Sequence, residues 1–146
     1  METKGLTVRK NRTLKILTAI LALCAIYWFV LRTDPRVDAL NQALIEIGSP
    51  ALRNYPYSFK VISLEGGSAV MGSPRSFDVP VYRMIGSLYP NLSGKAANDP
   101  DFIAAEKELA KMQSEARTIV LAQPGVSGVK WELDKNWLIA HNIQIN

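Results

Sequence analysis

Residues 16–31, ILTAILALCAIYWFVL, carry no charged side chain. Lys15 and Arg32 bound this stretch, and Leu14 together with the apolar stem of Lys15 extends it to about eighteen residues. A helix of that length is about 27 Å long, close to the roughly 30 Å core of a bilayer, and it satisfies its own backbone polar groups. The stretch therefore predicts a transmembrane helix over residues 14–32.

Lysine and arginine residues are distributed unevenly around this stretch. Five precede it, and the two that follow closely are interleaved with aspartates. Because basic flanks stay in the cytoplasm, the pattern predicts a single-pass inner-membrane protein with residues 1–13 cytoplasmic and residues 33–146 forming one periplasmic domain. The lipid bilayer is then one partner. Four side chains are expected at the membrane interface, namely Lys15, Tyr27, Trp28 and Arg32.

Two other interpretations compete with a retained signal anchor. A secretory signal peptide would be cut after a small residue such as Ala22 or Cys24, which would leave the apolar run AIYWFVL at the new N-terminus. A lipoprotein would be acylated on Cys24, but Leu23 stands where a lipobox has a small residue. A mitochondrial inner-membrane protein would show the same charge asymmetry as a bacterial one.

The formal net charge of +4 lies in the N-terminal part of the chain. Residues 33–146 contain eleven basic and twelve acidic side chains, a net charge of −1, so a basic face for nucleic acid is not expected. The single cysteine, Cys24, excludes a disulfide within the chain. No phosphate loop, dinucleotide fingerprint or zinc-ligand spacing occurs, so no cofactor, metal or enzymatic activity is predicted.

Residues 33–146 read as a small α+β domain, in which a three-stranded, mainly antiparallel sheet is packed by amphipathic helices. Gly66-Gly67 predicts a tight hairpin, and the third strand is expected to join that hairpin. Asp-Pro pairs mark two of the helix starts, since aspartate caps a helix and proline suits its first turn. The predicted helices are 35–47, 80–90, 100–122 and a last one after Asp134; the predicted strands are 59–64, 68–71 and 129–133.

Apolar residues in the helix 100–122 alternate steps of three and four, which is the spacing of a coiled-coil seam. The six seam residues are Phe102, Ala105, Leu109, Met112, Ala116 and Ile119. One interpretation is that the seam contacts a partner protein through Leu109 and Met112. The other is that the helix packs on the sheet of its own domain, which the two alanines and the lack of basic flanking residues favour.

Other side chains suggest a ligand site or a reaction. Tyr55 and Tyr57 are candidates for a pocket, and Arg75, in the loop Gly72–Ser76, is a candidate for an anionic group. Glu132 and Asp134 are two residues apart, as paired carboxylates of a hydrolase would be. His141 has no companion that would make it a catalytic base or a metal ligand.

The function expected from these observations is protein binding, as an accessory or assembly subunit of an envelope complex. The second interpretation is a tethered module that binds a small ligand or a cell-wall polymer. The third is a hydrolase. The candidate partner-binding residues are Arg75, Tyr55, Tyr57, Leu109 and Met112.

Overall fold

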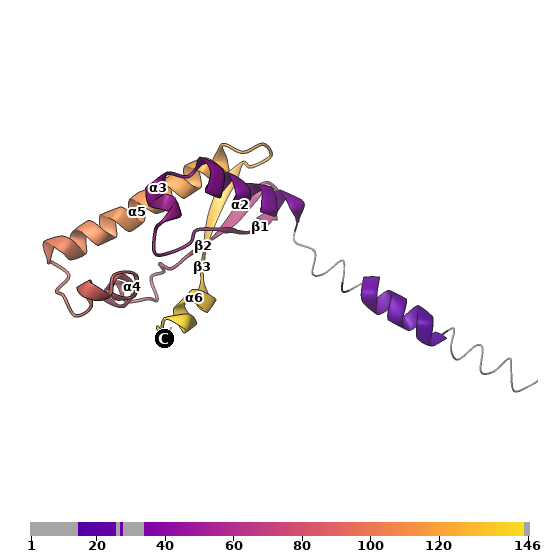
Figure 1. Cartoon of the computed structure of the whole chain (residues 1–146), viewed down its shortest axis with the longest axis horizontal. Coiled ribbons are helices and arrows are strands. Elements are labelled where there is room, and N and C mark those ends of the chain that lie inside the picture. Colours follow the sequence, from indigo (N-terminus) through magenta and orange to yellow (C-terminus); the bar gives the residue numbers. More distant parts are fainter. Residues whose placement is uncertain (1–14, 26, 28–33, 145–146) are drawn as a thin grey trace, which may run out of the picture. The chain divides into compact units, whose positions relative to one another are not determined.

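The computed structural model describes residues 15–25, 27 and 34–144 of the chain. Its contacts divide the chain into two units, one ending at Thr33 and the other beginning at Asp34. Each unit is described by itself, and Figure 1 shows the elements of both.

The described part of the N-terminal unit consists of residues 15–25 and Tyr27, all helical and exposed. Across the described residues of both units, no helix combines the length and apolarity needed to cross a membrane. The predicted transmembrane helix over 14–32 is therefore wrong, and so are the signal-anchor, inner-membrane and periplasmic assignments that depended on it.

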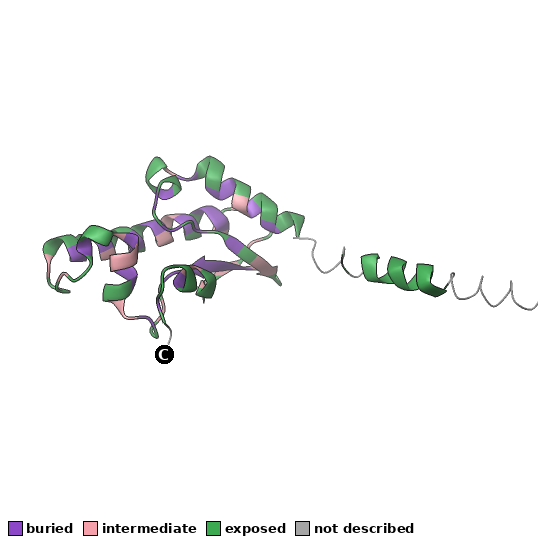
Figure 2. Cartoon of the chain, turned by 60° about the horizontal axis from the view of Figure 1, so that its bottom comes forward, coloured by how far each residue is buried: buried purple, intermediate pink, exposed green. Residues whose placement is uncertain are grey.

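The second unit is an α+β domain with a three-stranded sheet in the order β1-β2-β3. Helices α2 and α5 pack against each other, and they contact the strands β1 and β3 respectively (Figures 1 and 2). Its elements are α2 (Pro35–Ile47), α3 (Pro50–Arg53), β1 (Val61–Glu65), β2 (Ser68–Ser73), α4 (Val81–Leu88), the 3-10 turn η1 (Pro90–Leu92), α5 (Pro100–Leu121), β3 (Gly128–Leu133) and α6 (Lys135–Ala140).

The two Asp-Pro pairs start helices where the sequence predicts them. The Asp34 carboxylate accepts the N–H of Arg36 at 2.9 Å and so caps α2. Asp99 accepts the N–H of Asp101 at 2.9 Å and caps α5. The helix α3 was not predicted; Ser49 caps it by accepting the N–H of Leu52 at 3.2 Å.

The predicted hairpin is confirmed. Gly66 and Gly67 both have positive φ angles, 53° and 85°, which a two-residue hairpin turn requires. Residues with a side chain rarely adopt such angles. The turn sets Glu65 opposite Ser68, and β1 and β2 then pair antiparallel with one irregularity between Val61 and Ser63.

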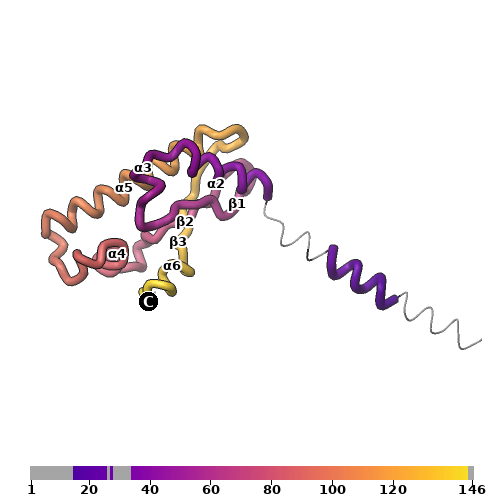
Figure 3. The backbone as a smooth tube through the Cα atoms, viewed as in Figure 1, coloured from indigo at the N-terminus to yellow at the C-terminus, as the bar shows by residue number. Residues whose placement is uncertain are grey.

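The third strand joins the hairpin beside β2, as expected, but it runs parallel to β2. The sheet is therefore mixed, and the prediction of a mainly antiparallel sheet is wrong. The reason lies in the connection, because the chain passes through α4, η1 and α5 between β2 and β3 (Figure 3). A long helical crossover of this kind returns the chain to the same end of the sheet, which produces a parallel pair.

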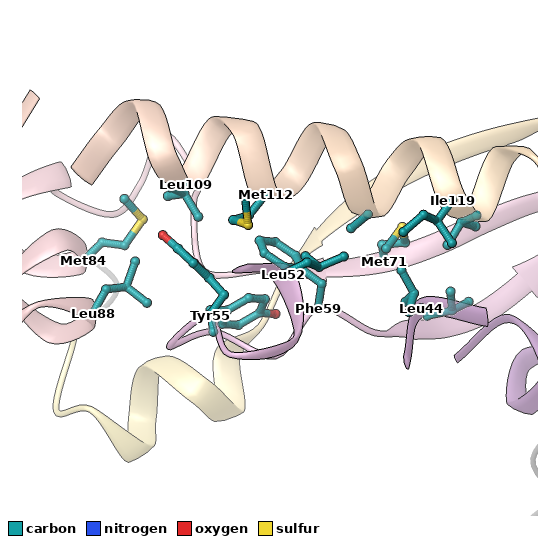
Figure 4. Packing of buried hydrophobic residues seen from close by; sticks show 14 of the residues in the cluster. Leu44, Leu52, Tyr55, Phe59, Met71, Met84, Leu88, Leu109, Met112 and Ile119 are labelled. Carbon is teal, nitrogen blue, oxygen red and sulfur yellow. The ribbon is translucent and has the colours of Figure 1, made fainter. Parts of the chain in front are cut away.

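The seam of α5 lies in the core of its own domain. All six seam residues are buried, and Figure 4 shows Leu109, Met112 and Ile119 packed among apolar side chains from α3, α4 and β2. At the edge of this seam, Glu115 accepts hydrogen bonds from the Ser49 N–H (2.7 Å) and the Ser49 hydroxyl (3.1 Å). These two bonds join α5 to the start of α3.

Candidate functional site

The outer edge of β3 exposes backbone groups that the fold does not use. Backbone N–H and C=O groups alternate in direction along a strand. Asp134, directly after β3, donates its N–H to the Ser73 carbonyl of β2 at 2.8 Å, so the even-numbered residues of β3 face β2. The N–H and C=O groups of Val129, Trp131 and Leu133 consequently point away from the sheet.

Nothing in the described part of the chain pairs with these outward groups. β3 has β2 as its only neighbour in the sheet, and no hydrogen bond from another described element reaches its outer side. Three consecutive side chains of the strand, Lys130, Trp131 and Glu132, are exposed, with 37% of Trp131 accessible. An unpaired strand edge of this kind is a template for another strand.

At the opposite edge of the sheet, a side chain pairs with the backbone of β1 at Val61. Asn41 of α2 donates its Nδ2–H to the Val61 carbonyl at 3.0 Å, and its Oδ1 accepts the Val61 N–H at 2.7 Å. The side-chain amide of Asn41 thus makes the hydrogen bonds that a neighbouring strand would make to Val61, which is only 3% exposed. The two edges of the sheet therefore differ at this point, because Val61 of β1 has a side-chain partner, whereas the outward groups of β3 have none among the described residues.

Asp134 holds the end of β3 in place. One oxygen accepts the Trp137 N–H at 2.9 Å and caps α6, while the other accepts the Tyr57 hydroxyl at 3.1 Å. Burial raises the pKa of Tyr57, and the adjacent Asp134 charge and the hydrogen bond to Asp134 raise it further. This junction ties β3 and α6 to the segment that precedes β1.

The raised pKa of Tyr57 predicts alkaline destabilisation. In the unfolded chain tyrosine ionises near pH 10, whereas the folded chain resists ionisation, so the contribution of Tyr57 is complete below about pH 10 and is lost as pH rises above it. We expect Tyr57→Phe to flatten the fall in unfolding free energy above about pH 10, measured by urea unfolding across that range. The matched control is Tyr82→Phe, on an exposed tyrosine. If the unfolding free energy fell equally steeply with pH in the wild type and in Tyr57→Phe, Tyr57 would not be the source of the alkaline destabilisation.

The sequence-predicted partner residues divide into buried and exposed positions. Leu109 and Met112 are each 1% exposed, and Tyr55 and Tyr57 are 7% and 1% exposed. Both tyrosine rings contact Phe59, with ring centroids 6.0 Å and 4.9 Å away, and Figure 4 shows Tyr55 among core side chains. None of these four side chains offers a surface to a partner.

Arg75 is exposed in the loop that follows β2. The buried Ser73 hydroxyl organises this loop by accepting the Arg75 N–H at 3.1 Å and the Gln113 amide at 2.8 Å. The exposed guanidinium and the buried tyrosines therefore do not form one ligand site. Of the predicted membrane-interface residues, Lys15 and Tyr27 are exposed, whereas Trp28 and Arg32 lie outside the described residues.

The two carboxylates considered for a hydrolase differ in their surroundings. Both oxygens of Asp134 accept hydrogen bonds that hold the fold, whereas Glu132 is exposed on β3. The His141 ring stacks on Trp137 with centroids 4.0 Å apart, and its Nδ1 lies 2.8 Å from the Trp137 carbonyl. Within residues 15–25, 27 and 34–144, no three His, Cys, Asp or Glu side chains are grouped to hold a metal ion.

Sequence reasoning missed both edges of the sheet. The alternation of Val129, Trp131 and Leu133 indicates a strand, but only the pairing with β2 shows that its other side is open. Asn41 carries no signal in the sequence, because an asparagine on a helix is ordinarily a solvent-facing residue. Comparison of the chain with protein-family models, curated proteins and solved structures gave no match.

Proposed function

We propose that this chain is a protein-interaction module, and that it binds an extended segment of a partner protein along the outer edge of β3. The observation that carries the proposal is the row of backbone groups at Val129, Trp131 and Leu133 that have no partner among the described residues, whereas at the β1 edge Asn41 already occupies both backbone groups of Val61. An added strand gains affinity from main-chain hydrogen bonds and selectivity from alternate side chains.

The side chains of β3 suit such a partner. Val129 and Leu133 are half-buried, and the Trp131 ring is anchored on Phe59 with centroids 6.1 Å apart while more than a third of the residue stays exposed. An aromatic side chain held by its own core and exposed at its rim is a common anchor of protein interfaces. Lys130 and Glu132 place opposite charges on the other face of the strand, which favours a partner strand with the reverse charge order.

Site-specific photocrosslinking tests the proposal. We expect a photoreactive residue at position 130 of the full chain to crosslink to protein in the cell, and one at position 107, on the exposed side of α5, to crosslink much less. Adding Val129→Pro removes one outward N–H and leaves the even-numbered N–H groups that bond to β2, so it is expected to abolish the crosslink at 130.

Val129→Thr is the matched control for this variant, since it keeps both the branched shape and the N–H. Amide hydrogen exchange at Lys130 and Glu132 reports whether the pairing with β2 survives in each variant. Equal crosslinking at positions 130 and 107, or a crosslink at 130 that persists in a folded Val129→Pro variant, would refute strand addition at this edge.

A further inference from the structure

The charge order of β3 allows the strand to pair with itself. Its sequence is GVKWEL, in which Lys130 and Glu132 are placed symmetrically about Trp131. We propose that the strand bound at this edge belongs to a second copy of the chain, paired antiparallel about a twofold axis at Trp131. This inference rests on the proposed function, since it names the partner of the same edge.

Backbone geometry permits this register. An antiparallel pair centred on Trp131 sets that residue opposite its own copy and sets Val129 opposite Leu133. These three residues are the ones whose N–H and C=O groups point outward, so each facing pair exchanges two backbone hydrogen bonds. The two three-stranded sheets would then join into one sheet with the two β3 strands at its centre.

Side-chain charges select this register among its neighbours. With the axis at Trp131, Lys130 of each copy faces Glu132 of the other, which gives two opposite-charge pairs in the closely spaced, non-hydrogen-bonded positions. Moving the axis to Lys130 sets two lysines opposite each other, and moving it to Glu132 sets two glutamates opposite each other. An axis at Leu133 sets Glu132 against Asp134, both acidic, and an axis at Val129 pairs no charges.

Charge reversal with complementation tests the inference. We expect the full chain to dimerise in sedimentation equilibrium, and both Lys130→Glu and Glu132→Lys to weaken the dimer about tenfold or more, because each variant converts both attractive pairs into repulsive ones. An equimolar mixture of the two variants restores association, since every 130–132 contact between unlike chains then joins opposite charges. The double variant Lys130→Glu/Glu132→Lys restores it as well.

Lys107→Glu is the matched control, because it makes the same charge change on the exposed side of α5 and retains the same N-terminal unit. Amide exchange gives an independent measurement, with protection of Val129, Trp131 and Leu133 expected to rise with protein concentration. The inference would be overturned if neither single charge reversal changed the dissociation constant of the dimer, or if the equimolar mixture failed to restore association.

The outcomes also separate this inference from the proposed function. If the chain is monomeric at all concentrations and position 130 crosslinks to a different protein, a second copy is not the partner, although strand addition still holds. If position 130 crosslinks to no protein, both the proposed function and this inference fail. A crosslinked product with twice the mass of the chain supports both.

Discussion

Leu109→Ala is expected to lower the free energy of unfolding by about 2–5 kcal/mol. Leu109 is 1% exposed and lies in the seam of α5, beside Met84 and Met112 in Figure 4. Removing most of its side chain loses buried apolar contacts and leaves a cavity that the surrounding helices fill only in part. Urea or thermal unfolding of the full chain measures the loss.

Lys107→Ala is the control for this variant, since it truncates an exposed side chain two residues away on the same helix. We expect it to change the unfolding free energy by no more than about 0.5 kcal/mol. The comparison also decides between the two interpretations of the seam. If Leu109 instead contacted a partner, alanine would weaken binding and leave the isolated chain nearly as stable as before.

Asn41→Ala is expected to lower the unfolding free energy by about 2–4 kcal/mol, since it leaves the N–H and C=O of Val61 without partners and each buried unpaired group costs about 1–3 kcal/mol. The loss exceeds that of an ordinary surface truncation because one side chain satisfies both groups (3.0 Å and 2.7 Å). Chemical denaturation gives the energy, and amide exchange at Val61 shows whether the β1 edge has opened.

Gln42→Ala serves as the control, because Gln42 is exposed and its side-chain amide donates to Glu46 of the same helix, at 2.9 Å. We expect a change of about 0.5 kcal/mol or less from it. Asn41→Asp separates the two bonds, since the carboxylate still accepts the Val61 N–H and loses the donor to the Val61 carbonyl. A variant Asn41→Ala as stable as Gln42→Ala would show that the β1 edge does not need this side chain.

The sequence predicts most elements of residues 34–144 because their signals are local. Asp34-Pro35 and Asp99-Pro100 mark helix starts, since a capping carboxylate reaches an N–H two residues away. Gly66-Gly67 marks the hairpin, since its positive φ angles belong to the turn itself. The helix α3 escaped prediction because four residues are too few to show a helical period.

The site was less accessible to prediction. Apolar periodicity is the same for a helix that packs on its own core and for one that docks on a partner, so Leu109 and Met112 were candidates for a surface they do not reach. Tyr55 and Tyr57 are likewise core residues. An uncharged apolar stretch also resembles a membrane span in sequence, and this similarity led to the transmembrane prediction that the structure overturns.

By itself, the sequence determined the order of the strands and of the longer helices, the aspartate caps and the hairpin turn, because each depends on atoms a few residues apart. Only the tertiary structure decided that β3 runs parallel to β2, that α5 buries its seam, and that Asn41 pairs with Val61 at one edge of the sheet while the outward groups of β3 have no partner in the described part of the chain. Those features depend on contacts between residues about 20 to 60 positions apart, such as Asn41 with Val61 and Ser73 with Asp134. Long-range pairing of this kind leaves no pattern in neighbouring residues.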